Sequence, residues 1–276
     1  MTTGTTKSDK ELAFLHDLFI APDWGERFAA LIDEHVKFPK EGKAVYLASG
    51  TGSHAISIRN RIGEKLRLTC LDENEECLEL ARAKTKAAHE IIEFRHGTLD
   101  HLSLPDNHFD VVIGNASLVR TDRVPRILSE MVRIAAPDAK VAIALPTASS
   151  FGEFFSIYWE ALHNNGLIDL ESGVEHLITE LPTISDVERM AEEAGLEDIT
   201  SWTTLEEFDF ESGEQFLNSP LVADFLIHGW LGSVPQNRRE NVIREIARVI
   251  NEDRHEAEFA LSVKSTLVLG RKAHSH

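Results

Sequence analysis

Short apolar runs alternate with amphipathic stretches over the first half of the chain. Five of these runs have the length and composition of buried strands, at 44–49, 66–72, 91–97, 109–115 and 139–146. Between them the spacing of apolar residues predicts helices, as over about 123–136, where Val124, Ile127, Leu128 and Met131 share one face. Strands that alternate with helices in this way favour a parallel, doubly wound sheet.

The pattern changes at both ends of the chain. Residues 11–36 predict a helix that is broken near Pro22, with one apolar stripe formed by Leu12, Leu15, Leu18 and Phe19. After Pro146 we expect helices at 151–166, at 185–195 (opened by a capping box from Ser185 to Glu188) and over roughly 213–256. Strands at 199–210 and 258–272 complete a set of seven, and we expect this last pair to be antiparallel. The fold expected is therefore α/β, a Rossmann-like doubly wound seven-stranded sheet that is mostly parallel with an antiparallel last strand and has helices on both faces.

Charge and composition narrow the partners and the compartment. The 46 acidic residues outnumber the 28 Lys and Arg residues, which gives a net charge of −18. Such a surface repels phosphate backbones, so we expect no nucleic-acid partner. The two cysteines are too few for a disulfide framework. Without a secretory signal or an apolar run long enough to span a bilayer, a cytoplasmic protein with no membrane span is expected.

The stretch YLASGTGSHA, residues 46–55, is a candidate binding loop. Gly50 and Gly52 follow an apolar run directly, and they permit a tight turn and a close approach of the backbone to a ligand. The helix that should follow offers free backbone N–H groups. A turn with two glycines also joins strands to helices without any ligand, so this pattern by itself leaves both interpretations open.

Asp72 adds weight to the binding interpretation. It ends the second predicted strand and lies 20 residues after Gly52, where a carboxylate can accept hydrogen bonds from both hydroxyls of a ribose. Glu75 and Glu76 are better explained as the solvated acidic start of a helix, favoured by the helix dipole. We expect the loop and Asp72 to lie together at the carboxyl ends of neighbouring strands.

Two further motifs carry a family resemblance. The run Leu104-Pro105-Asp106-Asn107-His108-Phe109-Asp110 leads into the fourth strand, and a Leu-x-Glu-x-x-Arg pattern spans Leu128 to Arg133. Together with the glycine loop and Asp72, they resemble the class I S-adenosylmethionine-dependent methyltransferases, and most of all the branch related to ubiquinone and menaquinone biosynthesis. The resemblance covers roughly residues 40–200 and the final strand.

This resemblance implies S-adenosyl-L-methionine as cofactor and in-line transfer of its methyl group to a small-molecule acceptor, through an oxygen, carbon or nitrogen nucleophile. The family has no universal catalytic residue, so the catalytic residues stay unknown. Residues 1–40 would form an N-terminal helical cap and 41–276 the methyltransferase domain, with helical insertions at about 147–180 and 211–257 as a candidate substrate lid. The cofactor-binding residues implied are Ala48, Ser49, Gly50, Gly52, Asp72, Glu73, Thr98, Leu99 and Asn115.

The resemblance assigns each of these residues to one portion of the cofactor. The loop 49–52 would contact the methionine portion, Asp72 the ribose, and Glu73 would pack near the adenine. Thr98 and Leu99 stand where the family places an acid for the adenine amino group and an apolar residue against the ring. Asn115 would close the pocket through its backbone.

The chain departs from the family pattern in the loop itself. Tyr46 stands where an acid is usual, and Ala48 replaces the first glycine, which is acceptable where φ stays negative. These departures leave open a degenerate, non-catalytic binding protein whose cleft Tyr46 blocks. The Gly50–Ala55 pattern also fits the fingerprint of an NAD(P)-dependent oxidoreductase.

Other candidate groups have a simpler interpretation. The stripe of Phe151, Phe154, Phe155 and Tyr158 is interpreted as a buried helix face rather than an acceptor pocket. The histidines lack the spacing of metal ligands, so no metal site is expected.

Overall fold

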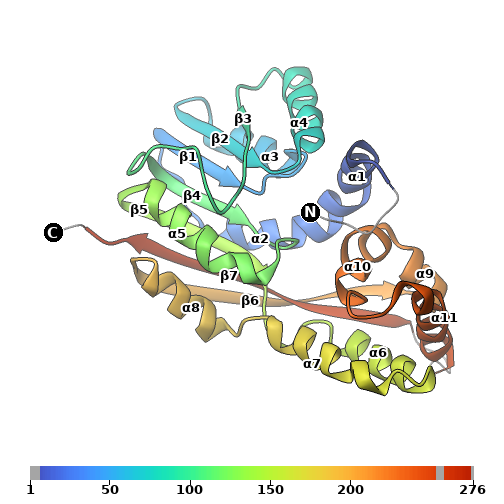
Figure 1. Cartoon of the computed structure of the whole chain (residues 1–276). Coiled ribbons are helices and arrows are strands. Elements are labelled where there is room, and N and C mark those ends of the chain that lie inside the picture. The colour runs from blue at the N-terminus through green and yellow to red at the C-terminus, as the bar shows by residue number, and fades with distance from the viewer. Residues whose placement is uncertain (1–6, 253–257, 275–276) are drawn as a thin grey trace. The chain divides into compact units, whose positions relative to one another are not determined.

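The computed structural model describes residues 7–252 and 258–274, which divide into two compact units (Figure 1). The larger unit contains residues 7–146, 183–204 and 265–274, and the smaller unit contains 147–182, 205–252 and 258–264. Every predicted cofactor-binding residue belongs to the larger unit. The predicted domain boundaries and the substrate lid stay predictions.

The seven predicted strands are present and form one sheet. They are β1 (Gly42–Leu47), β2 (Leu66–Asp72), β3 (Glu93–His96), β4 (Phe109–Asn115), β5 (Ala135–Pro146), β6 (Leu196–Phe210) and β7 (Phe259–Lys272). Their order is β3-β2-β1-β4-β5-β7-β6. Neighbouring strands from β3 to β5 are parallel, and β7 is antiparallel to β5. The predicted mostly parallel, doubly wound sheet is therefore confirmed.

The strand order reverses between β1 and β4, which are sequence-distant neighbours. Ligands of open α/β sheets bind at such a switch point, beyond the carboxyl ends of the strands. Here those ends are Leu47, Asp72 and Asn115, each followed by a loop of the larger unit. The topology thus brings the predicted binding residues to one edge.

Strand β5 begins at Ala135, four residues before its predicted start. Ala135 pairs with Phe109 and Lys140 pairs with Val111, so the residues between them form an irregularity in the ladder. Asp138, at the tip of this irregularity, has a φ of +63°. The apolar run alone did not predict the extra length because 136–138 are half-buried or exposed.

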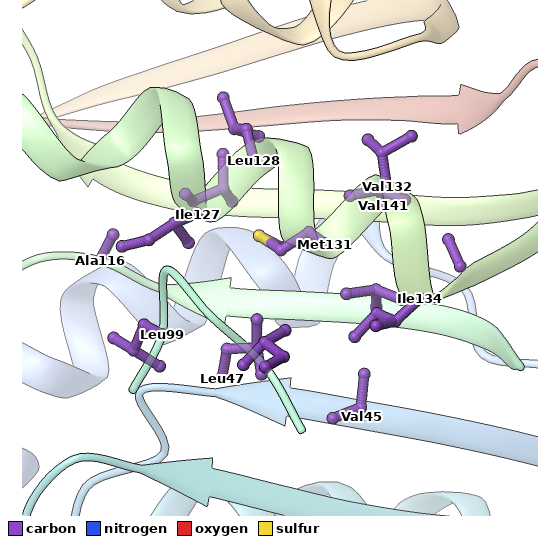
Figure 2. Packing of buried hydrophobic residues seen from close by; sticks show 14 of the residues in the cluster. Val45, Leu47, Leu99, Ala116, Ile127, Leu128, Met131, Val132, Ile134 and Val141 are labelled. Carbon is purple, nitrogen blue, oxygen red and sulfur yellow. The ribbon is translucent and has the colours of Figure 1, made fainter. Parts of the chain in front are cut away.

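One face of the sheet in the larger unit is covered by α5 (Val124–Ile134) and α8 (Ile184–Glu193). Figure 2 shows Ile127 and Met131 of α5 in one buried cluster with Val45 and Leu47 of β1 and Val141 of β5. This apolar face explains the stripe predicted over 123–136. The remaining helices of this unit are α2 (Glu26–His35), α3 (Ser53–Ile62), α4 (Glu75–Ala87) and the 3-10 turn η2 (Thr121–Arg123).

The predicted capping box of α8 is wrong by two residues. The N-cap is Thr183, whose hydroxyl accepts from the Asp186 backbone while the Asp186 carboxylate accepts from the Thr183 backbone N–H. Thr-x-x-Asp satisfies the same reciprocal geometry as the Ser185–Glu188 pair, one half-turn earlier. The Glu188 carboxylate instead accepts from the Ser201 hydroxyl.

The N-terminal segment is a continuous helical run, and the predicted break at Pro22 is wrong. It passes from α1 (Asp9–Leu15) through a π-helix, η1 (His16–Gly25), into α2. The predicted apolar stripe is wrong as well, because Leu18 is 62% exposed whereas Ile20 and Trp24 are buried. The i→i+5 hydrogen bonds of a π-helix widen the turn, so a 3.6-residue period no longer identifies the buried face.

The smaller unit is helical apart from its parts of β6 and β7. Its helices are α6 (Gly152–Asn164), η3 (Ile168–Leu170), α7 (Glu171–Glu180), α9 (Gly213–Asn218), η4 (Leu221–Leu226), α10 (Ile227–Trp230) and α11 (Gln236–Glu252). The helical stretch predicted over 213–256 is thus four elements, and its residues 253–256 lie outside the described residues. Phe154 is buried and stacks on Trp230 with ring centroids 4.1 Å apart, which confirms the buried-face interpretation of the aromatic stripe.

Candidate functional site

The glycine loop, residues 48–52, turns sharply after β1. Ala48, Gly50 and Gly52 have φ angles of +54°, +54° and +77°. The expectation that φ stays negative at Ala48 is therefore wrong, because this tight reversal places three alternate residues in the left-handed region. An L-residue with a side chain costs about 1–2 kcal/mol there, so Ala48 is strained where glycine would not be.

Side chains of the protein itself explain why Gly50 and Gly52 are glycines. A Cβ at Gly52 would lie 2.8 Å from the Cβ of Ala81 on α4. A Cβ at Gly50 would lie 2.6 Å from Cε1 of His16, the first residue of η1. Both contacts are closer than real Cβ atoms approach their neighbours. The loop is thus packed from two sides, by α4 and by the N-terminal segment.

Asp72 lies directly beside the glycine loop, as the spacing in the sequence led us to expect. It is buried, and one carboxylate oxygen accepts from the Gly50 backbone N–H at 2.8 Å while the other accepts from the Asn74 N–H at 2.9 Å. Burial raises the pKa of Asp72, and the hydrogen bonds from Asn74 and Gly50 oppose that rise. A carboxylate has about four lone-pair positions, so it keeps acceptor capacity for a further donor.

The carboxylate of Glu73 is occupied by contacts within the protein and is not free to pack against an adenine ring. Its carboxylate accepts from the Leu99 backbone N–H at 3.0 Å and forms a bidentate pair with Arg123, which also binds Asp100. The hydrogen bonds from Arg123 are the main reason why the pKa of Glu73 is lowered. Leu99 itself is buried in the core, and the exposed Thr98 hydroxyl donates to the His101 carbonyl.

Asn115 and Tyr46 belong to the paired strands β4 and β1. The Asn115 amide donates to the Gly25 carbonyl at 3.4 Å, and its side-chain oxygen accepts from the Ser117 N–H. The Tyr46 ring is buried, and its hydroxyl is 2.9 Å from Nδ1 of His54, whose Nε2 is 2.7 Å from Asp33. Tyr46 is therefore directed at α3 and α2, where its hydroxyl has a strong polar partner.

The two motifs that carry the resemblance contact each other rather than the glycine loop. Arg133 donates to the carbonyls of Leu102 and Leu104, both at 2.9 Å, and pairs with Glu130 and Asp106. Glu130 in turn accepts from the Leu102 N–H. The Leu-x-Glu-x-x-Arg helix thus holds the Leu-Pro-Asp segment in place.

Asp110, which closes the same motif, has a structural contact of its own. Its carboxylate accepts from the Lys43 N–H at the start of β1 at 2.8 Å. It also takes the space that a Cβ on Gly42 would need. The end of the motif therefore fixes the entry of the chain into β1.

The chain is similar to known methyltransferases in sequence. Residues 45–143 match the family model described as a methyltransferase domain. A demethylmenaquinone methyltransferase of Bacillus licheniformis is 27% identical over 170 residues, which cover 58% of this chain and 73% of that protein. One from Staphylococcus epidermidis is 32% identical over 124 residues, 44% of this chain and 51% of that protein.

The chain contains a methyltransferase domain of the S-adenosylmethionine-dependent kind over residues 45–143. Solved structures share its fold. The YcgJ protein from Bacillus subtilis aligns over 91% of this chain and all of its own, with a TM-score of 0.60 and 14% identity. A Haemonchus contortus phosphoethanolamine N-methyltransferase, solved with S-adenosyl-L-methionine, aligns over 98% of this chain and 59% of its own, with a TM-score of 0.59 and 14% identity.

The residues around the loop of this methyltransferase suit its cofactor. The positive φ angles turn the loop tightly, the Asp72 carboxylate keeps acceptor capacity, and the buried Ser49 hydroxyl has beside it the thiol of Cys70, a weak hydrogen-bonding partner. The cofactor-binding roles of Ala48, Ser49, Gly50, Gly52, Asp72, Glu73, Thr98, Leu99 and Asn115 stay predictions. Glu73 and Leu99 are the two whose observed contacts least resemble an adenine pocket.

The sequence did not reveal the contribution of the N-terminal segment. His16 packs on Gly50, and the Asp17 carboxylate accepts from the Thr51 hydroxyl at 2.6 Å and pairs with Lys84. The sequence predicted this segment only as part of an N-terminal helical cap and gave no contact between it and the loop. A π-helix is the signal that could have drawn attention to it, because such turns are frequent at functional sites, but it is visible only in the structure.

Over residues 7–252 and 258–274, no helix combines the length and apolar character that crossing a bilayer requires. Nor do their His, Cys, Asp and Glu side chains form any group of three or more that could hold a metal ion.

Proposed function

We propose that this methyltransferase binds S-adenosylmethionine across the carboxyl ends of β1, β2 and β4 and transfers its methyl group to a small organic acceptor. The observation that supports this placement is the contact between Asp72 and the Gly50 N–H, which joins the ribose-binding acid to the glycine loop. The bound cofactor supplies a methyl group that is already activated by the sulfonium. The protein must therefore mainly align the acceptor in line and exclude water.

Each part of the site has a separate task in this proposal. Asp72 accepts hydrogen bonds from the ribose, and the glycine loop lies against the methionine portion. The Glu73–Arg123 pair fixes the backbone at Leu99, beside which the resemblance places the adenine. A general base is needed only for a hydroxyl or protonated amine acceptor.

The acceptor that the relatives favour is a demethylmenaquinone-like quinol. Both relatives described above, from Bacillus licheniformis and Staphylococcus epidermidis, carry the name demethylmenaquinone methyltransferase. The net charge of −18 favours a neutral or cationic acceptor over a polyanion and argues against nucleic acid. On such a quinol, the reaction would replace a ring C–H by a C–CH3 bond and release the proton.

Calorimetric titration with S-adenosylhomocysteine tests the cofactor site. We expect saturable binding by the wild-type chain, and a loss of about tenfold to a hundredfold in Asp72→Asn because hydrogen bonds to a charged acceptor are replaced. The matched control is Glu75→Gln, which removes an acid three residues away that pairs with Arg82 on α4. An equal loss in both variants, or no binding by a folded wild-type sample at millimolar ligand, would refute the placement.

The acceptor is tested separately by turnover. The chain is incubated with S-adenosylmethionine and either a short-chain demethylmenaquinone analogue held reduced, or a small primary amine. Mass spectrometry then looks for a gain of one methylene equivalent, about 14 Da. Methylation of the amine alone would reject the quinol while leaving the methyltransferase assignment intact.

Two alternative functions are not favoured. The match to a methyltransferase domain disfavours an NAD(P)-dependent oxidoreductase. A degenerate protein blocked by Tyr46 is disfavoured as well, because the hydroxyl of that residue bonds to His54 on α3 and its ring is buried.

A further inference from the structure

The segment from β1 to the end of the glycine loop contains no acidic side chain. Residues 43–52 contain neither Asp nor Glu, and Tyr46 takes the position where the family usually has an acid. S-adenosylmethionine carries a sulfonium, an ammonium and a carboxylate group, so its methionine end has a net positive charge. A site that binds it gains from a nearby negative group.

The N-terminal π-helix η1 brings such a group to the loop. The Asp17 carboxylate accepts from the hydroxyl of Thr51, the residue between the two glycines, at 2.6 Å. The neighbouring imidazole of His16 lies against Gly50, at the position a Cβ would take. Thus two consecutive side chains of η1 contact two consecutive residues of the loop.

The far end of η1 meets the other strand that borders the predicted site. Gly25, its last residue, accepts a hydrogen bond from the Asn115 amide at the end of β4. The segment is therefore fastened both to the loop after β1 and to the end of β4. These are the two places assigned above to the methionine portion and to closing the pocket.

The charges around Asp17 leave it ionised. Burial would raise the pKa of Asp17, but hydrogen bonds from Lys84 and Thr51 together outweigh burial and lower it. Its carboxylate side chain is still 24% exposed. His16 is half-buried, and burial lowers its pKa to about 4, so it is neutral near pH 7 and adds no positive charge beside the loop.

We propose that η1 replaces the acid missing from β1, with Asp17 as the carboxylate that faces the ammonium group of the methionine portion and His16 as the side chain that packs beside it. This inference rests on the proposed placement of the cofactor. It makes Asp17 a residue that distinguishes ligands with an amino acid end from those without one.

The test compares two ligands on the full chain by calorimetry. S-adenosylhomocysteine has the adenosine and the amino acid end, whereas 5′-methylthioadenosine has the adenosine and sulfur only. For Asp17→Asn we expect the affinity for S-adenosylhomocysteine to fall about tenfold, as for loss of one charge-assisted contact, and that for 5′-methylthioadenosine to change less than twofold. Asp17→Glu, which keeps the charge, should recover most of the loss.

The control lies in the same π-helix. Asp23 has a side chain that is 55% exposed and pairs with Arg27, so Asp23→Asn removes an equal charge without touching the loop. It should leave both affinities unchanged. An equal loss of both ligands in Asp17→Asn, or no loss of either, would overturn the role of Asp17. Failure of the wild-type chain to bind either ligand would instead overturn the cofactor placement, and this inference with it.

Discussion

Two segments that flank the parallel strands are held in different ways, one before the start of β4 and one after the end of β1. The segment 102–106 before β4 is held by Glu130 and Arg133 of α5, and these residues belong to the same family motifs as the segment itself. The glycine loop, which departs from the family at Tyr46 and Ala48, is held by His16 and Asp17 as well as Asp72. His16 and Asp17 precede residue 45, where the match to the methyltransferase domain begins.

The difference shows which part of the chain supports a motif that departs from the family pattern. A motif that matches the family carries its own support, because both partners lie within the matched region. A motif that departs takes support from a segment that the family does not specify. If this is correct, the glycine loop should be sensitive to changes in η1 and α4, and the other loop to changes in α5.

The largest effect is expected for Gly52→Ala. The left-handed φ of Gly52 would cost about 1–2 kcal/mol with a side chain, and the contact with Ala81 adds about 1–3 kcal/mol of overpacking. Gly166→Ala is the control, since its φ is +67° but no atom lies within 4 Å of the added Cβ. The free energies of unfolding in urea should differ between the two variants. Equal losses would mean that α4 does not crowd the loop.

A pH effect of about 3 kcal/mol is expected from His16. Burial lowers its pKa to about 4 from an ordinary 6.5, with Asp17 opposing and Lys84 adding to the shift. Below pH 6.5 the unfolded chain binds a proton that the folded chain refuses, so this contribution to stability is complete above pH 6.5 and is lost as the pH falls towards 4.

The measurement compares unfolding free energies of the wild type and His16→Gln at pH 7 and pH 4. Asp17 and Lys84 are the charged groups that act on His16, and both stay in the variant. The advantage of the wild type should shrink by about 3 kcal/mol on acidification. A constant difference would show that His16 is not buried on the loop.

Arg133→Met should cost about 2–3 kcal/mol. It removes a charged donor from the Leu102 and Leu104 carbonyls and leaves Glu130 without its ion pair. Arg189→Met is the control, because that side chain is 57% exposed and pairs only along the surface of α8, so its loss should be much smaller. Urea unfolding checks both. Similar losses of unfolding free energy in the two variants would show that α5 does not stabilise the segment 102–106.

The sequence predicted best those features that local pattern determines. Strands buried on both faces are continuous apolar runs, and the bounds predicted for 66–72 and 109–115 are those observed. The spacing of Gly52 and Asp72 predicted their shared edge because parallel strands end together. Where two capping patterns overlapped, at Thr183 and Ser185, the pattern alone could not choose between them.

The features that were missed depend on contacts between distant residues. Arg123 meets Glu73 across 50 positions, and no local signal announces that pair. The π-helix brings His16 against Gly50, and a 3.6-residue period of apolar positions cannot indicate either the π-helix or this contact. Consequently the loop and Asp72 could be located from the sequence, whereas His16 and Asp17 beside the loop could not.

The smallest effect, and one of opposite sign, is expected for Ala48→Gly. Ala48 is held at a φ of +54°, so glycine should relieve the strain and stabilise the fold by about 1 kcal/mol, less the entropy that glycine gains in the unfolded chain. The control is Ala55→Gly, a buried helical position of α3 where the same change should destabilise. Urea unfolding measures both. If Ala48→Gly also destabilises, the left-handed turn is not strained, and the loop tolerates alanine because the helices around it, rather than glycine, set its conformation.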